Sequence, residues 1–371
     1  MDYDTYVKEL SSVLIGGLWN IDGCVVRDGY LEVGGWAVPP GNDRKSVGFT
    51  VNGHPFDEIE YPFAREDIEQ VLWFSDSAKN SGFRCRTKLT DSNSWECLRF
   101  QFVSNKTNVP FNALHDEYYL NPELNGKLPT PDAALIRRVH GTESKDTFLM
   151  RGFGLYAKLK QLVKGNFGRE FADFSSILDW GCGSGRVTRY FAILDKLNIT
   201  GADIDLNSIE WCKQNLPFGT FHKIPVQPPT QFKSASFDLL LGISVFTHLG
   251  EREQFLWLSE LKRIAMKNGV LLMSVLGKTG MCRSQLPQRD VSALYDRGLL
   301  ETKIDPVSLA LHGVSPIGPA PYFVEELGDV YRMTYHTEAF IRREWSKYFE
   351  IVDFLPGYLS NNQDLVVMRT N

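Results

Sequence analysis

The fold of this 371-residue chain is decided by one stretch, Ile177-Leu-Asp-Trp-Gly-Cys-Gly-Ser-Gly-Arg-Val-Thr-Arg-Tyr190. It reads as a short apolar strand, a turn with glycines at alternate positions, and the start of a helix. Glycine permits positive φ angles in such a turn and lets a ligand approach the backbone closely. A second apolar strand, residues 199–205, ends in Asp203 and Asp205. An acid about 20 residues after the turn is well placed to bind ribose hydroxyls, so we predict a site for a nucleoside-bearing cofactor.

The details of the turn distinguish between cofactors. Residues 179–185 read Asp-x-Gly-x-Gly-x-Gly, with an acid two residues before the first glycine. A dinucleotide fingerprint, Gly-x-Gly-x-x-Gly, lacks its third glycine, because Arg186 and Thr188 occupy the two positions where it would fall. The Gly-Lys-Ser/Thr ending of a nucleotide-phosphate loop does not follow either. An acid at this place repels a pyrophosphate but suits the ammonium group of a methionine moiety.

With this turn, the chain resembles the class I S-adenosylmethionine-dependent methyltransferases over approximately residues 130–371. The resemblance implies an α/β fold with a Rossmann-like sheet of seven strands, the last of them antiparallel, and S-adenosylmethionine as the cofactor. The cofactor-binding residues that we expect are Asp179, Gly181, Cys182, Gly183, Gly185, Asp203, Ile204, Gly242 and Ser244. The family commonly places an acid for the adenine after the third strand, but residues 221–226 contain none. Which residues hold the adenine therefore stays open.

Short alternating runs predict a β domain ahead of the part that resembles methyltransferases. Asp28-Gly29 and Asn52-Gly53 stand between apolar-rich runs and are strong hairpin signals. Residues 82–88 and 95–103 alternate with period two, as half-buried antiparallel strands do. We expect a β-sandwich-like accessory domain, which either binds a carbohydrate or partner through exposed aromatic residues or serves only for packing. Packing is favoured, because tryptophans such as Trp19 are more often core residues.

The seven strands of the main sheet are expected near residues 176–180, 198–203, 219–222, 236–242, 269–275, 350–355 and 364–369. Helices are expected between them, and the last two strands read as a closing hairpin. The expected organisation is an accessory domain over residues 1–105, a linker and helical lid region over 106–164, and a methyltransferase domain over 165–371. An insertion near residues 277–335 is expected to form a lid or an acceptor pocket.

Composition and charge narrow the function classes. The formal net charge is −5 and no basic tract is present, which argues against nucleic acid as an obligatory partner. The Asn/Asp-Pro-Pro-Tyr/Phe/Trp sequence of nucleic-acid methyltransferases is missing after the fourth strand, where residues 244–247 read Ser-Val-Phe-Thr. The first residues lack the regions of a signal peptide, and no apolar run approaches the ~20 residues that cross a bilayer, so no membrane partner is expected. The six scattered cysteines predict no metal site and free thiols in a reducing cytoplasm.

Catalytic residues are expected in the loop after the fourth strand, because ligands lie beyond the carboxyl ends of strands. His248 is the residue of this loop whose ordinary pKa lies near neutrality, so it is the first candidate for a general base. Its alternative role is to cap or pack against the next helix. The candidates for contact with the acceptor or the cofactor carboxylate are His140, Arg151, Tyr335 and His336. For each of these four, ordinary packing is the alternative.

The sequence thus predicts a methyltransferase that uses S-adenosylmethionine and acts on a small-molecule acceptor. A hydroxyl on a sugar or natural-product scaffold is the preferred acceptor, because His248 would supply a base. Two alternatives are N-methylation of a small amine, and a catalytically inactive binding or scaffold protein that retains the fold. The intact acid and glycine positions of the turn argue against the inactive protein, because a site without a ligand does not need them.

Overall fold

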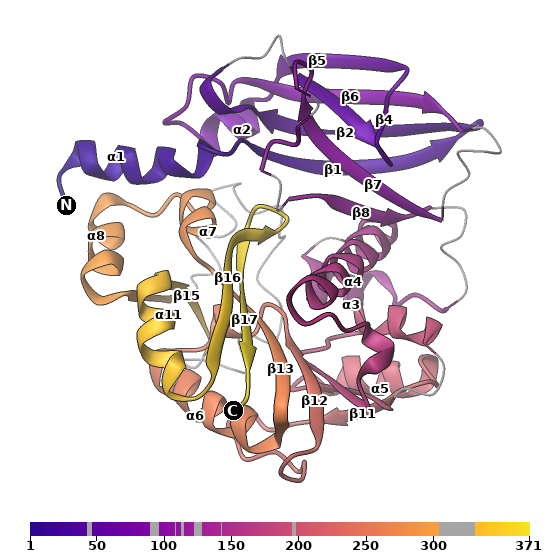
Figure 1. Cartoon of the computed structure of the whole chain (residues 1–371), viewed down its shortest axis with the longest axis vertical. Coiled ribbons are helices and arrows are strands. Elements are labelled where there is room, and N and C mark those ends of the chain that lie inside the picture. The colour runs from indigo at the N-terminus through magenta and orange to yellow at the C-terminus, as the bar shows by residue number, and fades with distance from the viewer. Residues whose placement is uncertain are drawn as a thin grey trace.

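The computed structural model describes residues 1–42, 47–89, 96–107, 109–112, 115–121, 128–141, 143–194, 198–303 and 331–371. A β module from the N-terminal part of the chain lies at one end of the molecule, and a mixed sheet with its helices lies at the other (Figure 1). Between them lie helices of the insertion and of the segment that precedes the main sheet (Figure 1).

The β module is a sandwich of two four-stranded sheets. The first has the order β1 (Leu18–Arg27), β2 (Tyr30–Val38), β6 (Asn80–Lys88), β5 (Glu58–Ala64). The second has the order β4 (His54–Pro55), β3 (Val47–Val51), β7 (Cys97–Ser104), β8 (Glu117–Leu120). Both predicted hairpins are confirmed: β1 pairs with β2 and β3 with β4, through two-residue turns in which Asp28, Gly29, Asn52 and Gly53 all have positive φ.

Side chains from both sheets fill the interior of the sandwich. Trp19 and Leu31 of the first sheet pack in one cluster with Phe49 and Phe102 of the second. Trp19 is 1% exposed, so it is a core residue and not an exposed platform for a ligand. Trp73, in contrast, is 45% exposed and lies outside this cluster.

The strand β8 is a departure from the sequence prediction, which placed only a linker after residue 105. Its residues pair with β7 in an antiparallel register, with Leu98 opposite Tyr119. Tyr119 is 2% exposed and belongs to the sandwich core, and the burial of this ring outweighs the weak strand signal of a four-residue run. The sandwich therefore continues beyond the range that we expected.

Two helices follow the sandwich, largely within the region that was predicted to be a linker and a helical lid. They are α3 (Ala133–His140) and α4 (Lys145–Phe167). Gly141 separates them with a φ of 78°, and Asp132 and Ser144 cap their N-termini by accepting hydrogen bonds from backbone N–H groups. Helix α4 lies so close to β8 that a Cβ atom on Gly154 would overlap the carbonyl oxygen of Tyr118.

The main sheet has the seven strands that were predicted, in the order β11-β10-β9-β12-β13-β17-β16. Its strands are β9 (Ser176–Trp180), β10 (Asn198–Asp203), β11 (Thr220–Lys223), β12 (Phe237–Gly242), β13 (Ala265–Val275), β16 (Glu350–Leu359) and β17 (Gln363–Arg369). The last strand, β17, runs antiparallel to both of its neighbours, as predicted. Alternate residues of β12 point to opposite faces, where Leu240 packs with Leu258 of α6 (Glu251–Ile264) and Leu239 packs with Leu159 of α4.

The carboxyl ends of the parallel strands face the β module (Figure 1). The helix α5 (Leu206–Asn215) follows β10, and the glycine turn after β9 leads into the 3-10 helix η7 (Thr188–Ile193). Ligands of open α/β sheets bind at this end of the strands. The architecture therefore directs the site toward the junction of the sheet, the β module and the insertion.

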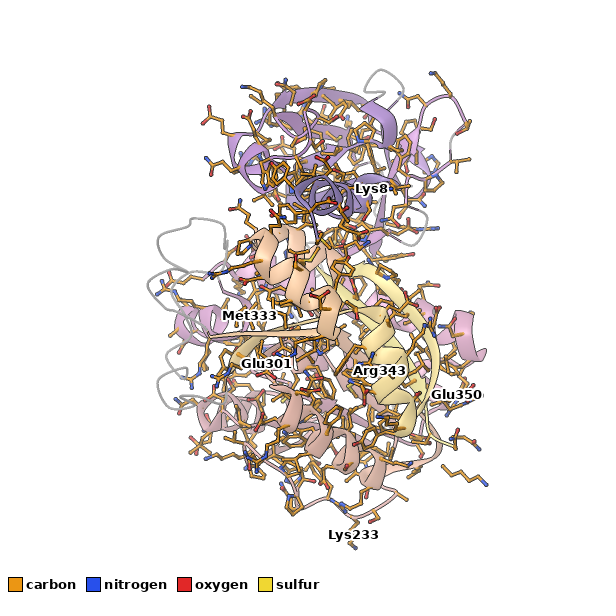
Figure 2. All side chains as sticks on the ribbon, turned by 90° about the vertical axis from the view of Figure 1, so that its left-hand side faces the viewer. Lys8, Lys233, Glu301, Met333, Arg343 and Glu350 are labelled. Atoms are coloured by element: carbon orange, nitrogen blue, oxygen red, sulfur yellow. The ribbon has the colours of Figure 1, made fainter. Side chains whose placement is uncertain are left out.

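The insertion lies between β13 and α11 (Glu338–Glu344). It contains α7 (Lys278–Arg283), α8 (Gln288–Arg297), β14 (Leu299–Lys303) and β15 (Arg332–His336), and residues 304–330 of it lie outside the described residues. The N-terminal helix α1 (Tyr3–Ser11) packs on this insertion, and Figure 2 shows it, at Lys8, between the β module and α8. The Tyr6 hydroxyl donates a 2.9 Å hydrogen bond to the carbonyl of Leu286, which ties the two parts together.

Candidate cofactor and acceptor site

The glycine turn after β9 has the backbone that its sequence predicts. Gly181, Gly183 and Gly185 have φ angles of 80°, 52° and 75°, in the region that L-residues with side chains rarely adopt. A Cβ atom on Gly181 would overlap the Cγ2 atom of Val245, and one on Gly183 would lie 2.8 Å from the Cγ2 atom of Val139. Because Val139 belongs to α3, this helix covers the turn.

Backbone hydrogen bonds hold the turn against the end of β10. The N–H groups of Gly181 and Cys182 both donate to the carbonyl oxygen of Ala202, at 2.7 and 3.2 Å. The Cys182 side chain packs with Cys212 and Phe221 beneath α5, and its pKa is raised by the neighbouring Cys212 thiol and by burial. Its thiol therefore packs in the core. At this position the turn can contact a ligand only through its backbone atoms.

Asp179 lies at the end of β9, just before the turn, and is 4% exposed. The Thr188 hydroxyl donates a 2.5 Å hydrogen bond to its Oδ2 atom, and Thr188 is the donor to this carboxylate among the described residues. Burial, followed by the negative charge of Asp203, raises the pKa of Asp179 to about 6. A buried carboxylate with one neutral donor can still accept a cationic group such as an ammonium.

Asp203 lies at the end of β10, and its carboxylate connects the glycine turn to the residues that follow this strand. Its Oδ2 atom accepts from the N–H of Gly183 at 2.7 Å, and its Oδ1 atom accepts from the N–H of Asp205 at 2.8 Å. Burial raises its pKa. Because each carboxylate oxygen has two lone pairs, both atoms can accept one more donor, such as a ribose hydroxyl.

Asp205, the second acid of the strand, has a different role. It caps α5 by accepting from the N–H of Asn207 at 3.2 Å and from the hydroxyl of Ser208 at 2.6 Å. Its Oδ2 atom also lies 2.9 Å from the Nε atom of Arg138 on α3. This ion pair, which the sequence analysis missed because its partners are 67 positions apart, joins the helix above the turn to the loop after β10.

The loop after β12 is fixed by a polar network that also reaches the last strand. Ser244 has a φ of 61°, and its N–H donates to the hydroxyl of Ser274 at 2.7 Å. The Gln363 amide donates to the Ser244 hydroxyl at 2.9 Å and accepts from the Ser274 hydroxyl at 2.7 Å. Gly242 has a packing role, because a Cβ atom there would overlap the sulfur of Met273. Gln363 had no signal in the sequence beyond its place in the turn of the closing hairpin.

His248 ends the 3-10 helix η8 (Phe246–His248) beyond β12. Its Nδ1 atom lies 3.0 Å from the carbonyl oxygen of Arg332, and its ring stacks on Tyr331 with the centroids 4.2 Å apart. A carbonyl can only accept, so Nδ1 carries the proton and Nε2 carries the lone pair. Burial lowers the pKa of His248 to about 4, although the Arg332 carbonyl opposes this. The negative charge of Asp203, after burial, raises the pKa of Tyr331, which places this ring pair near the cofactor acids.

The remaining residues of the predicted cofactor site are apolar. Ile204 is half-buried and packs, with Ile224, against the core on one face of the sheet. The N–H of Ile224 donates to the carbonyl oxygen of Asp203 at 2.9 Å. These two side chains therefore lie beside Asp203, the ribose-binding candidate.

Two of the four predicted acceptor contacts lie near the turn. His140 ends α3, and its Nε2 atom is 3.2 Å from the Thr147 hydroxyl. Burial lowers the pKa of His140 to about 3, and the positive charges of Arg186 and Arg151 lower it further. Arg151, on α4, donates a 3.2 Å hydrogen bond to the carbonyl oxygen of Ile21 in β1. Both residues lie where the covering helices meet the β module.

The structure places the other two, Tyr335 and His336, in packed interior. They are 3% and 1% exposed and, as neighbours on β15, point to opposite faces that are both covered. Tyr335 packs in the cluster of α1, α7 and α8, and the His336 Nε2 atom lies 3.0 Å from the Oε1 atom of Gln254. Their described contacts are packing contacts, and the expectation that they contact the acceptor stays a prediction.

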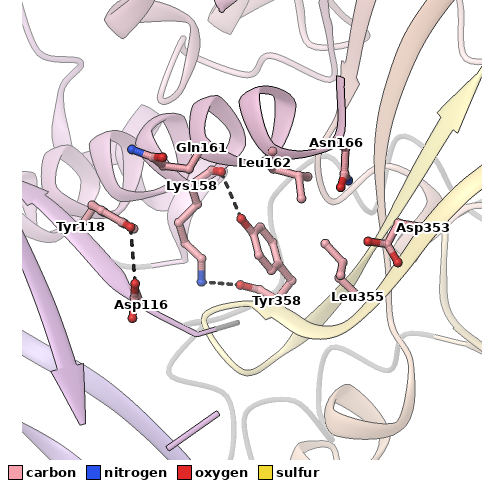
Figure 3. A pocket seen from close by; sticks show the side chains of 10 residues that line it. Asp116, Tyr118, Lys158, Gln161, Leu162, Asn166, Asp353, Leu355 and Tyr358 are labelled. Carbon is pink, nitrogen blue, oxygen red and sulfur yellow. Dashed lines mark hydrogen bonds between the residues drawn. The ribbon is translucent and has the colours of Figure 1, made fainter. Parts of the chain in front are cut away.

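A polar cleft lies away from this turn, between β8, α4 and β16, with a volume of about 250 Å³. Figure 3 shows the reciprocal hydrogen bonds inside it, in which Lys158 donates to the Tyr358 carbonyl and the Tyr358 hydroxyl donates to the Lys158 carbonyl. The carboxylates of Asp116 and Asp353 also line it. None of its lining residues belongs to the predicted cofactor site.

Residues 178–273 match the model of a family described as a methyltransferase domain. This range runs from β9 to β13 and includes the glycine turn, Asp203 and His248. The chain contains a class I methyltransferase domain that uses S-adenosylmethionine. The residues of this methyltransferase fit the cofactor, since Asp179 can still accept a cation and Asp203 retains lone pairs.

Among the solved structures that this methyltransferase resembles, two are distant likenesses that are themselves named as methyltransferases. It is similar to an S-adenosylmethionine-dependent methyltransferase from Methanosarcina mazei, with 16% identity, a TM-score of 0.40, and coverage of 56% of this chain and 96% of that chain. It is also similar to the 1,6-didemethyltoxoflavin-N1-methyltransferase of Burkholderia thailandensis, with 14% identity, a TM-score of 0.41, and coverage of 69% and 96%. No curated protein matches its sequence. In the described part of the chain, no helix has the length and apolar character that a membrane crossing requires.

Proposed function

We propose that this methyltransferase methylates a hydroxyl group of a small molecule, such as a sugar or natural product, with His248 as the general base. The hydrogen bond from Nδ1 of His248 to the Arg332 carbonyl carries the proposal. It fixes the tautomer in which Nε2 is unprotonated and can accept a proton. The same bond stabilises the imidazolium that forms when the hydroxyl loses its proton.

We assign the cofactor contacts to the residues around the glycine turn. Asp179 accepts the ammonium group of the methionine moiety, the backbone of residues 181–185 follows that moiety, and Asp203 holds the ribose hydroxyls. S-adenosylmethionine supplies an electrophilic methyl group when it is bound, so the chain mainly orients the acceptor and excludes water. Val139 of α3 covers the turn, which supports the exclusion of water.

The lowered pKa of His248 favours a second candidate function. A histidine whose pKa is about 4 is neutral at pH 7 but is a weak base. N-methylation of a small amine requires no strong base, because an unprotonated amine attacks by itself. The two candidates differ in how strongly turnover depends on His248.

The test is methyl transfer to a panel of hydroxylated and amino acceptors, followed by formation of S-adenosylhomocysteine. For a hydroxyl acceptor, we expect His248→Gln to lower kcat by about 10²–10⁴-fold, the usual contribution of a general base, without changing the affinity for S-adenosylmethionine. His54→Gln, an exposed site in β4, serves as the control. Turnover of a hydroxyl acceptor at the wild-type rate by His248→Gln would exclude the base. Turnover of amines alone would select the second candidate.

We also propose a reducing, cytoplasmic location. All six cysteines are unpaired, and five of them are buried, which supports thiols that stay reduced. Thiol labelling of the unfolded protein, isolated from its host without reductant, tests this: six free thiols are expected, and disulfides would contradict it.

A further inference from the structure

Three arginines meet where the glycine turn, α4 and α7 approach the β module. Arg186 directly follows the glycine turn, Arg151 lies on α4, and Arg283 ends α7. We call Arg151, Arg186 and Arg283 the arginine cluster. Their side chains are half-buried, so part of each remains accessible from outside the packed core.

Contacts with the same strand bring two of these arginines together. Arg151 donates to the carbonyl oxygen of Ile21 at 3.2 Å. Arg283 donates at 3.1 Å to the carbonyl oxygen of Ser360 and at 3.2 Å to that of Asn361, and the Asn361 amide in turn donates to Trp19. Trp19 and Ile21 are two residues apart on β1, a separation of about 7 Å.

The third arginine is held to the first by close packing of the backbone. Gly152, next to Arg151, approaches the turn so closely that a Cβ atom there would overlap the carbonyl oxygen of Arg186. The pKa values of Arg186 and Arg283 also indicate that both lie near Arg151. Burial, and then the charge of Arg151, lowers the pKa of Arg186 and that of Arg283 to about 10.

The arginine cluster has no contacting carboxylate within the described part of the chain. Its hydrogen bonds go to neutral carbonyl oxygens, and none of its members forms an ion pair with a described carboxylate. Three carboxylates attract the cluster without forming an ion pair with it: Asp22, which is paired with Arg65 at 2.7 Å, Asp179 and Glu117. Partly buried cations without a contacting carboxylate attract anions, so this cluster can hold an anion that the described residues do not supply.

The cofactor cannot supply this negative charge. S-adenosylmethionine carries a sulfonium, an ammonium and a carboxylate, so its net charge is positive. Its ammonium group is assigned to Asp179, and its carboxylate can occupy only one position among three guanidinium groups. Resting on the methyl-transfer function proposed above, we propose that the arginine cluster binds a carboxylate or phosphate group of the methyl acceptor. Guanidinium groups match the planar geometry of both anions.

The test is calorimetric titration of the full-length protein with sodium phosphate, with sodium acetate and with sodium chloride at equal ionic strength. We expect phosphate or acetate, but not chloride, to bind, and the stronger of the two identifies the anionic group of the acceptor. Arg186→Gln and Arg283→Gln should weaken this binding about tenfold or more, the effect of losing a charge-assisted hydrogen bond. Arg289→Gln, a variant at an 86% exposed side chain on α8, should bind as the wild type does. Absence of binding to the wild type, or equal losses in all three variants, would overturn the proposal.

Two further measurements separate this proposal from its alternatives. S-adenosylmethionine should bind Arg283→Gln as tightly as it binds the wild type. A parallel loss of cofactor affinity would assign the cluster to the cofactor carboxylate instead. If S-adenosylmethionine binds none of the proteins while phosphate still does, the methyl-transfer function fails but the anion site stands. Thermal unfolding without added anion checks for a structural role: Arg186→Met should unfold at the wild-type temperature or higher, because it removes an unpaired buried cation, and a lower temperature would contradict an anion site.

Discussion

The Nε atom of Arg138 lies 2.9 Å from the Oδ2 atom of Asp205, and this ion pair holds α3 over the glycine turn. Both side chains are largely buried, with 16% and 9% of their surfaces exposed. The neighbouring Val139 covers Gly183. Because the cofactor is assigned to the turn, its entry and exit depend on how firmly this pair holds the helix.

Loss of the Arg138 guanidinium should therefore speed the release of bound product. We expect Arg138→Gln to increase the dissociation rate of S-adenosylhomocysteine, measured by stopped-flow tryptophan fluorescence. Arg137→Gln is the matched control, because Arg137 lies on the same helix and pairs with Glu143 at the surface. Identical dissociation rates for the two variants would show that the ion pair does not gate the site.

Asp203 should contribute both to cofactor affinity and to stability. Asp203→Ala removes the acceptor for the Gly183 N–H as well as the proposed ribose contacts. Each lost hydrogen bond to a charged group costs about 1.5–3 kcal/mol, so affinity for S-adenosylmethionine should fall at least about tenfold. Calorimetry measures the affinity and thermal unfolding measures the stability. A fall in stability alone, with unchanged affinity, would remove Asp203 from the cofactor site.

Asp179 should make cofactor binding depend on pH. Its pKa of about 6 means that the carboxylate is charged at pH 7.5 and increasingly protonated below pH 6. The affinity for S-adenosylmethionine should therefore fall as pH falls, by at most about tenfold per pH unit below 6. The free energy of unfolding depends on pH in the opposite way. Because folding raises the pKa of Asp179, its protonated carboxyl group favours the folded state at acid pH, and this contribution to the free energy of unfolding is lost as pH rises through about 6.

Calorimetric titrations between pH 5 and pH 8 test the dependence attributed to Asp179. Asp179→Asn cannot titrate, so its affinity should be low and nearly independent of pH in this range. A wild-type affinity that is the same at pH 5 and pH 7.5 would contradict the assignment of the ammonium group to this carboxylate.

Two glycines of α4 should respond in opposite ways to the same substitution. Gly165 has open space where a Cβ would lie, so Gly165→Ala should raise the free energy of unfolding by up to about 1 kcal/mol, the difference in helix propensity. Gly154→Ala should lower it, because the new methyl group would overlap the Tyr118 carbonyl of β8. Chemical denaturation measures both. Stabilisation by both substitutions would mean that α4 and β8 are less closely packed.

The sequence was sufficient for the architecture of the main sheet because that sheet is determined locally. Its strands are buried on both faces and read as apolar runs, and the glycine turn has a composition that few other structures require. β8 escaped prediction because a four-residue strand depends on its partner, β7, more than on its own pattern. The site was also predicted incompletely because some of its contacts join residues that are far apart in the sequence. Arg138 pairs with Asp205, and Gln363 donates to Ser244. The burial of Tyr335 and His336 could not be predicted either, because the pattern of a single strand does not show that both of its faces are covered.

The packing of α1 on the insertion has a consequence during synthesis of the chain. Tyr6 and Leu10 find their apolar partners on segments that include Val291 and Leu294, almost 300 residues later. At about 5–20 residues per second, a ribosome needs roughly 15–60 s to make that stretch. During this interval the apolar face of α1 has only its nearer partners, such as Trp73 and Phe74, and lacks those of the insertion. Chaperones that recognise short apolar helices would therefore meet the first helix of this chain before its own insertion does.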